Sequence, residues 1–200
     1  TISLLYSDID PEYYQRLGYQ LCPAWEGRVD LQNISRSVTL PEEKLVPMSL
    51  PEERQALEEL YDSYHSRFAI SIARSSEYWD YLFQKHDADE LFWLQSSTGK
   101  RLGYVRLNVT DDKLKIRDWA FSECSEALLG TLMNTVIVEA SKREVAGLCG
   151  WLPNVESLSS VVSLTKREIE ITMLKTLVDD AKLPDELISS AEYFQEIDHV

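Results

Sequence analysis

Three histidines, three cysteines and several adjacent acids are the side chains of this sequence that could bind a metal or transfer a proton. Neither His65 nor His86 has a cysteine or a second histidine at ligand spacing, so the sequence predicts no metal site. The sequence also contains no G-x-S-x-G, P-loop or H-E-x-x-H pattern, which argues against a nucleophile elbow, a nucleotide loop and a zincin helix. Adjacent acids such as Asp111-Asp112 fall at an expected turn, where contact with solvent explains them.

Phenols gather instead near the start of the chain. Residues 6–20 read YSDIDPEYYQRLGYQ and contain adjacent tyrosines at Tyr13 and Tyr14. An apolar run at residues 2–6 is typical of a buried strand, and residues 19–23 begin a second strand. The pair therefore lies between two expected strands.

A two-turn helix is expected to carry this tyrosine pair. Asp8 or Asp10 can cap its first turn, where Pro11 is tolerated because its missing N–H would have no partner there. Gly18 can end the helix in the left-handed conformation. The irregular pattern of residues 25–47 predicts an extended connection after these elements, with one strand near residues 38–40.

From residue 48 onward, the periodicity predicts an α+β domain around a mixed, mainly antiparallel sheet flanked by helices. A capping box, Ser49-Leu-Pro-Glu52, precedes apolar residues at helical spacing as far as Phe68. The long helix is expected to pack across the sheet through Leu129, Leu132 and neighbouring apolar side chains. The expected elements are, in order, the helix after this box, a helix at 76–85, strands at 90–95, 101–109 and 113–121, the long helix at 123–142, a strand at 148–151, a helix at 155–162, a strand at 168–174 and a short helix after Pro184.

Charge and length restrict the classes of partner. The 200 residues carry 34 acids and 20 basic side chains, a net charge of −14 that repels the nucleic-acid backbone. We expect no nucleic-acid partner. The acidic balance permits a cationic amine and leans weakly towards one, although a solvated acidic surface is the commoner explanation. No apolar run reaches the length of about 18 residues that a membrane helix needs, so no membrane partner is expected.

Cysteine usage indicates the compartment. Cys22, Cys124 and Cys149 are odd in number, widely spaced and without a C-x-x-C pair. Together with the lack of a basic-then-apolar leader, this pattern predicts reduced thiols in a cytoplasmic protein.

The order of elements and three short motifs resemble the GNAT superfamily of N-acetyltransferases, in particular its Eis-like branch and the yeast lysine acetyltransferases. Members commonly carry, after their fifth strand, the helix pattern aromatic-Tyr-x-x-Leu-Gly-aromatic, which here reads Tyr13-Tyr14-Gln-Arg-Leu-Gly-Tyr. The preceding Leu-Tyr-Ser-Asp8-Ile is similar to the "SDI" segment of that branch. Arg74-Ser-Ser-Glu-Tyr-Trp79 is similar to its Arg-Ser-x-x-Tyr-Trp element. The resemblance covers most of the chain.

The resemblance implies that the chain starts inside a catalytic lobe. Its first residues, to about 23, correspond to the last strand, helix and strand of such a lobe, and a second GNAT-like lobe without acetyl-CoA follows in those proteins. We therefore expect residues 1–47 to be the terminal strand-helix-strand of a first lobe plus a connection. Residues 48–200 are expected to be a second, degenerate lobe. The start at Thr1 fits a truncated enzyme or ordinary removal of a tag.

Acetyl-CoA is implied as co-substrate of the full-length protein. Its pyrophosphate is usually held by backbone N–H groups of an Arg/Gln-x-x-Gly-x-Gly/Ala loop, and this sequence contains no such motif. At the equivalent junction of the second lobe, Glu123 and Glu126 would repel an anion. No cofactor-binding residue is therefore assigned in this chain.

The chemistry implied by the resemblance is direct attack of an amine on a thioester. It requires an acid for the departing thiolate, which the resemblance assigns to Tyr14, since a phenol is a suitable proton donor. The C-terminal carboxylate of Val200 or the imidazole of His199 is the candidate base. The alternative is that Tyr14 only packs in the core.

Two functions stay open from the sequence. The first is the C-terminal part of an acetyl-CoA-dependent N-acetyltransferase acting on a small amine or a lysine-like acceptor. The second is a non-catalytic GNAT-like module that acts in homo-oligomerisation or partner recognition.

Overall fold

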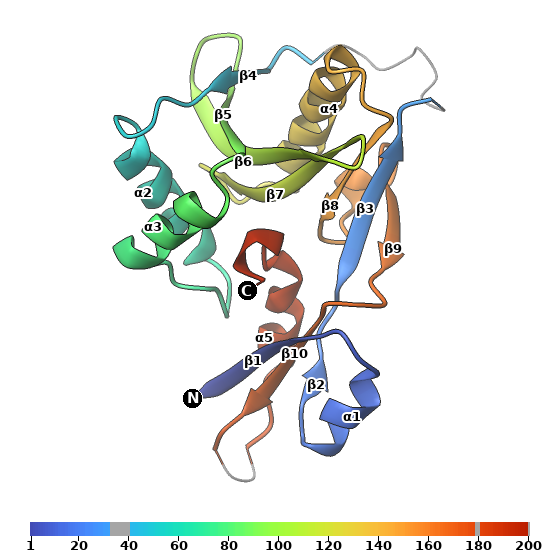
Figure 1. Ribbon diagram of the computed structural model, residues 1–200. Helices are drawn as coiled ribbons and strands as arrows, with labels where there is room; N and C mark the ends of the chain where they lie inside the picture. Colours follow the sequence, from blue (N-terminus) through green and yellow to red (C-terminus); the bar gives the residue numbers. More distant parts are fainter. Residues whose placement is uncertain (33–40, 179–180, 200) are drawn as a thin grey trace.

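Two β-sheets of different size organise the chain (Figure 1). The computed structural model describes residues 1–32, 41–178 and 181–199. Within these ranges, the smaller sheet has the strand order β1-β10-β2 and the larger has the order β4-β5-β6-β7-β8-β3-β9. The mixed α+β architecture, with a mainly antiparallel sheet flanked by helices, confirms the expected fold class.

The large sheet is antiparallel except where β7 pairs with β8. Helix α4 (Glu126–Lys142) makes the crossover that a parallel pair requires. It contacts β7, β8 and β4, and buries Leu129, Leu132, Met133 and Val136, as the sequence predicted. Burial of each such side chain contributes about 1.5–3 kcal/mol. The strands are β3 (Trp25–Asp30), β4 (Lys44–Pro47), β5 (Glu90–Gln95), β6 (Arg101–Thr110), β7 (Lys113–Phe121), β8 (Gly147–Trp151) and β9 (Ser163–Lys166).

Local turn and cap chemistry fixes several of these elements. In the β6–β7 hairpin Thr110 pairs with Lys113, and both turn residues, Asp111 and Asp112, have positive φ angles of 51° and 59°. Two residues with positive φ are what a tight type I′ turn requires. Helix α3 (Ser76–Lys85) begins after Ser75, whose hydroxyl accepts the N–H of Tyr78 at 3.2 Å.

The small sheet joins the two ends of the chain. β1 (Ile2–Ser7) pairs with β10 (Ile171–Thr176), which also pairs with β2 (Gln20–Leu21). Helix α1 (Pro11–Arg16) connects β1 to β2, and the Asp10 carboxylate accepts the N–H of Glu12 at 3.0 Å. Gly18 follows with a φ of 88°, as expected. A separate apolar cluster formed by Cys22, Leu174, Leu183, Ala191 and Phe194 lies under this sheet.

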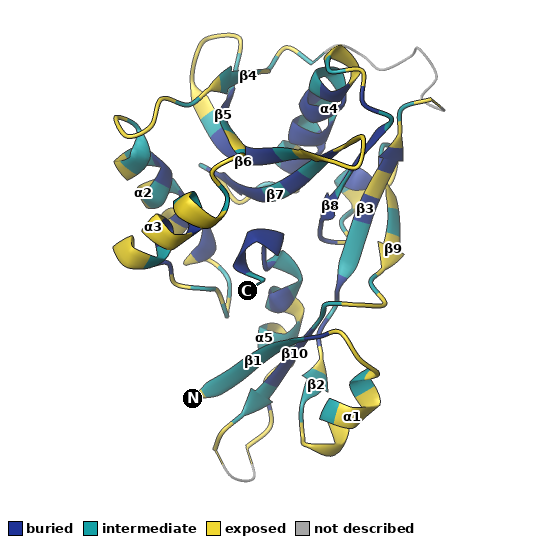
Figure 2. Cartoon of the chain, viewed as in Figure 1, coloured by how far each residue is buried: buried dark blue, intermediate teal, exposed yellow. Residues whose placement is uncertain are grey.

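Helices cover the large sheet unevenly (Figure 2). The strands β6 and β7 and helix α4 are rich in buried residues, whereas α1 and α3 expose much of their surface. The remaining helical elements are α2 (Arg54–His65), α5 (Asp185–Ser190) and the 3-10 turns η1 (Glu156–Leu158), η2 (Ala191–Tyr193) and η3 (Glu196–Asp198). None of the helices in the described residues combines the length and apolar character needed to cross a bilayer.

Several expected elements were wrong. The connection expected at residues 25–47 contains β3 and β4. The prediction overlooked the period-2 alternation of charged with apolar or small residues in β3, which reads WEGRVD. The helix expected at 155–162 is the single turn η1, followed by β9. Helix α2 begins at Arg54, since the carboxylate of Glu53 accepts the Ser49 N–H at 2.8 Å before the helix. The strand expected at residues 38–40 lies outside the described residues.

The division into residues 1–47 and 48–200 stays a prediction. The boundary between the two sheets does not coincide with it. β3 belongs to the large sheet although it precedes residue 48. β10 belongs to the small sheet although it lies near the end of the chain. The chain thus passes from the small sheet to the large one between β2 and β3, and returns between β9 and β10.

His65 predicts a pH dependence of folding. Its ring is 4% exposed, lies 4.1 Å from the ring of Tyr61, and leaves Nε2 without a partner among the described residues. Burial lowers the pKa of His65 to about 3, and the charge of Arg74 acts in the same direction. Between about pH 6.5, its value in an unfolded chain, and pH 3, the unfolded state binds more protons. The free energy of unfolding should therefore fall on acidification through this window.

The contribution of His65 can be measured by comparing the protein with a His65→Gln variant, which does not titrate. Urea denaturation at intervals between pH 7 and pH 4 should give a shallower decline for the variant, by up to about 1.4 kcal/mol per pH unit. Parallel declines would contradict a neutral, buried imidazole.

Candidate functional site

Tyr14 projects from α1 as part of a tyrosine cluster. Its ring is half-buried and meets Tyr13 edge-on at 5.2 Å and Tyr19 at 5.9 Å between centroids. Tyr19 is fixed in turn by a 2.7 Å hydrogen bond between its hydroxyl and that of Ser3 on β1. Among the described residues, the Tyr14 hydroxyl has no hydrogen-bond partner, whereas its ring is held on two sides. The ring of Tyr14 is therefore positioned by its neighbours.

A cavity of about 630 Å³ opens between the large sheet and the end of the chain. Glu26 of β3, Lys115 of β7 and Trp151 of β8 form its sheet side. Arg167, after β9, and Glu196, in η3, complete its lining. The volume is in the range of small-molecule sites, about 300–1,000 Å³.

A second hollow of about 510 Å³ lies next to the first. It is lined by Pro11 of α1 and Leu21 of β2, and shares Lys166 and Arg167 with the larger cavity. The helix that carries Tyr14 therefore borders a surface depression that continues toward Glu196.

Glu196 is a buried acid with an unused oxygen. Its Oε1 lies 2.8 Å from Lys115 Nζ and 3.9 Å from Arg117 Nη1, while Oε2 has no partner in the described part of the chain. Burial raises the pKa of Glu196, and the attraction of Lys115 and Arg117 opposes this rise. Because Oε2 is itself buried from solvent, Glu196 contributes its negative charge to the cavity wall rather than an accessible acceptor.

Arg167 forms the opposite wall. Its guanidinium lies 3.4 Å from the ring centroid of Trp151, and it donates to the Glu170 carbonyl at 2.7 Å and to Thr172 Oγ1 at 3.0 Å. Burial lowers the pKa of Arg167 to about 10, although the charges of Tyr6 and Glu170 oppose this. Its Nε has no partner among the described residues but is buried from solvent, so Arg167 contributes mainly its positive charge to the cavity wall.

Tyr6, Trp151 and His199 form an aromatic cluster beside the cavity. The ring of Tyr6 lies 5.5 Å from Trp151 and 5.1 Å from His199, the latter edge-on at 89°. Burial raises the pKa of the Tyr6 phenol, whose hydroxyl has no partner in the described residues. Residues from the start, the middle and the end of the chain therefore meet at one place.

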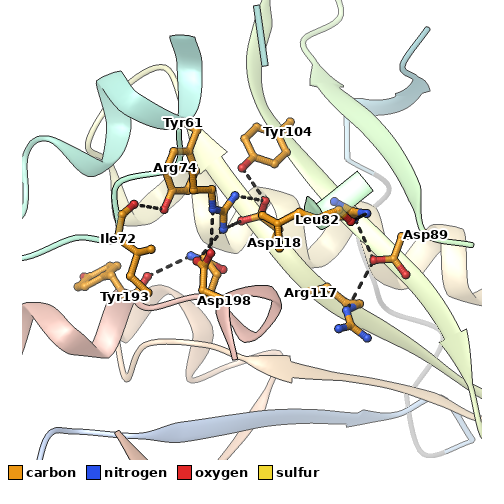
Figure 3. Close-up of polar contacts among 12 residues, drawn as sticks. Tyr61, Ile72, Arg74, Leu82, Asp89, Tyr104, Arg117, Asp118, Tyr193 and Asp198 are labelled. Carbon is orange, nitrogen blue, oxygen red and sulfur yellow. Dashed lines mark hydrogen bonds and ion pairs between the residues drawn. The ribbon is translucent and has the colours of Figure 1, made fainter. Parts of the chain in front are cut away.

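A buried ion network fixes the end of the chain (Figure 3). Arg74 donates to Asp118 at 2.7 and 3.1 Å and to Asp198 at 2.7 and 2.9 Å. The Tyr104 hydroxyl donates to Asp118 at 2.8 Å, and the Tyr61 ring lies 3.9 Å from the guanidinium. Burial opposes the charge of Arg74, but the attraction of Asp118 and Asp198 prevails and raises its pKa well above the usual value. Since Asp198 ends η3, Arg74 positions the turn that carries Glu196 and precedes His199.

The structure places the two sequence-predicted partners apart. In the described residues, no hydrogen bond or ring contact joins Tyr14 to His199, and His199 Nδ1 lies 3.3 Å from Glu170 Oε1 instead. Val200, the other candidate base, lies outside the described residues. The acid role of Tyr14 stays a prediction.

Sequence reasoning missed Glu196, Arg167 and the role of Arg74. A signal for the Arg74 network was present in β7, where Leu114, Ile116 and Asp118 alternate on the buried face. A carboxylate in phase with apolar residues indicates a buried ion pair. The residues of the cavity carry no such local signal.

Comparison with known proteins identifies the fold. No family model matches the sequence, and neither does any curated protein. Solved structures do match. A probable N-acyltransferase from Enterococcus faecalis V583 gives a TM-score of 0.62 at 15% identity, over 86% of this chain and 44% of that chain. A GCN5-related N-acetyltransferase from Sphaerobacter thermophilus gives a TM-score of 0.62 at 13% identity. The match covers 92% of this chain and 62% of that chain. Eis1 from Mycobacterium abscessus gives a TM-score of 0.56 at 17% identity, over 87% of this chain and 46% of that chain.

The fold is that of the GCN5-related N-acetyltransferases. At these identities the likeness concerns the fold alone. The chain spans less than two thirds of the length of each of these three structures, and less than half of two of them.

Arg74 should be essential for stability in this acetyltransferase-like fold. Arg74→Met leaves two buried carboxylates without a counter-ion, and should lower the free energy of unfolding by about 3–5 kcal/mol. Arg74→Lys should also destabilise, because an ammonium cannot make the same four bonds. Urea denaturation at neutral pH measures both effects.

Arg16→Met is the matched control, since Arg16 makes only an exposed ion pair with Glu12 at 3.5 Å. It should change the unfolding free energy by about 0.5 kcal/mol or less. Equal effects of Arg74→Met and Arg16→Met would contradict the anchoring role of Arg74.

Proposed function

We propose that this chain is the C-terminal part of an acetyl-CoA-dependent N-acetyltransferase that acetylates a cationic amine. The small sheet carries the proposal. Strand β10 returns from the large sheet to lie between β1 and β2, so the helix with Tyr14 is built into the same body as the cavity of Glu196. The fold that the chain shares with GCN5-related N-acetyltransferases supports this assignment.

A further lobe has a suitable place to dock. Among the described strands, β1 pairs only with β10, which leaves the other edge of β1 open to an additional strand. The surface next to this sheet is also apolar, because Ile9, Tyr13, Leu17 and Leu21 are exposed. An upstream lobe that extends the sheet at β1 would cover such a surface. The greater length of the matching structures supports such a lobe.

Acetyl-CoA would be bound by the upstream lobe, because the helix terminus in this chain does not fit its pyrophosphate. Helix α4 begins after Ser125, whose side chain makes no cap, and Glu126 occupies its first turn. Glu123 lies just before it and pairs with Lys100 at 3.2 Å. Negative side chains at a helix N-terminus compete with an anionic ligand.

The acceptor amine would be bound in the cavity. An ammonium group would be attracted by the negative charges of Glu26 and Glu196, which both line this cavity. In the reaction, the deprotonated amine forms a bond to the thioester carbon and the carbon–sulfur bond breaks. The phenol of Tyr14 gives its proton to the leaving thiolate, and the surplus proton of the amide nitrogen passes to a base or to water.

The chain by itself should not bind acetyl-CoA. Isothermal titration of the 200-residue protein with millimolar acetyl-CoA should give only heats of dilution, because the junction before α4 presents acids where the pyrophosphate would sit. Titration with coenzyme A lacking the acetyl group is the control for weak nucleotide binding. Saturable heat with either ligand would show that a donor site exists in this chain.

Tyr14→Phe should slow the chemical step in the protein that includes the upstream lobe. The substitution keeps the ring contacts with Tyr13 and Tyr19 but removes the proton, so folding should persist. Turnover should fall by about 10²–10⁴, the usual contribution of a positioned general acid.

Tyr13→Phe is the control, since Tyr13 is the neighbouring phenol and is 55% exposed. Its turnover should stay close to that of the unaltered protein in the same steady-state assay. Equal, small losses in both variants would make Tyr14 a structural residue.

The open edge of β1 supports one alternative, a non-catalytic module that oligomerises or binds a partner through this edge. The two functions differ in the coding sequence before Thr1. An Arg/Gln-x-x-Gly-x-Gly/Ala motif there favours the enzyme, and a start codon close to Thr1 favours the binding module.

A further inference from the structure

Three potential metal ligands meet where the small sheet contacts the end of the chain. Asp8 follows β1, Glu170 precedes β10, and the antiparallel pairing of Ser7 with Ile171 puts them side by side. His199 reaches the same place from the turn after η3. One ligand atom of each of the three side chains lies within 4.8 Å of those of the other two.

The three ligands are fixed to different degrees. The imidazole of His199 is held between Tyr6, edge-on at 5.1 Å, and Trp151 at 5.9 Å. The backbone of Glu170 is held by a hydrogen bond from Arg167 to its carbonyl at 2.7 Å, and its carboxylate already pairs with His199. Asp8 is exposed and can adjust its rotamer.

We propose that Asp8, Glu170 and His199 bind one divalent transition-metal ion of the Zn²⁺ type. One imidazole nitrogen and two carboxylates form the borderline ligand set that such ions prefer. Bonds of about 2.0–2.2 Å place tetrahedral ligand atoms about 3.3–3.5 Å apart. The observed 3.3 Å between His199 Nδ1 and Glu170 Oε1 fits this geometry before any ion is bound. The exposed Asp8 would complete the set by a change of rotamer, since its ligand atom lies within 4.8 Å of the other two.

The site differs from what the sequence predicted. A metal site was not expected because the histidines lack ligands at short spacing, whereas these three residues are distant in sequence. Bound metal would connect the segment after η3 to both long strands of the small sheet. The proposal is independent of the proposed acetyltransfer, and its test measures binding rather than activity.

Isothermal titration with zinc chloride, in a buffer that does not chelate, tests the site on the 200-residue protein. We expect one Zn²⁺ per chain, and at least about tenfold weaker binding for His199→Gln and for Glu170→Gln, since even outer-shell changes often cost that much. Circular dichroism establishes that each variant is folded. Co²⁺ in place of Zn²⁺ should give visible absorption bands that both variants lose.

Glu168→Gln is the matched control, because Glu168 is an exposed acid two residues from Glu170 and outside the ligand set. It removes the same charge and should keep the affinity for Zn²⁺. The proposal is overturned if the unaltered protein shows no saturable binding of Zn²⁺. It is also overturned if His199→Gln binds Zn²⁺ as tightly as the unaltered protein. Equal weakening in Glu168→Gln and Glu170→Gln would also overturn it, because binding would then reflect only the acidic surface.

Discussion

The charge of Arg74 is the constraint on which the arrangement of the molecule depends. A guanidinium excluded from water is stable only with partners that satisfy both its charge and its N–H groups. Asp118, in the middle of the large sheet, and Asp198, at the end of the chain, together provide these partners. The last turn of the chain is thereby attached to the core of the large sheet. Its neighbours Glu196 and His199 take their positions from this attachment.

The second determinant is the exchange of segments between the two sheets. The large sheet contains β3, from near the start of the chain, and the small sheet contains β10, from near its end. The cavity of Glu196 lies where these exchanges occur, with β3 and β9 on one side and the segment between β9 and β10 on another. A ligand in this cavity would therefore contact the large sheet, the segment between β9 and β10, and the turn η3. The same crossing brings Tyr6 and Asp8 to the residues that follow η3.

Elements with strong local signals were predictable from sequence. Helix α3 has the expected bounds, and the β6–β7 hairpin has its expected turn, because a serine cap and two tolerant turn residues act over a few positions. Strand β3 has an alternating sequence, WEGRVD, which the prediction overlooked. Strand β9 has only four residues, too few for alternation to identify it, so pairing with β3 defines it. The same limit applies to the site. Tyr14 belongs to a compact motif, whereas Arg167 and Glu196 meet only through the tertiary fold.

The position of β10 also bears on the order in which the molecule folds. Ile2 pairs with Thr176, so the small sheet forms only after almost the whole chain is available. Contacts of such long sequence separation are costly in loop entropy and are usually made late. The β5–β6–β7 meander and α4 join neighbours in sequence and can form first. During synthesis β1 and β2, which flank the helix with Tyr14, would stay unpaired until β10 is made. Pairing of β10 would then bring α1 and the cavity together in one late step.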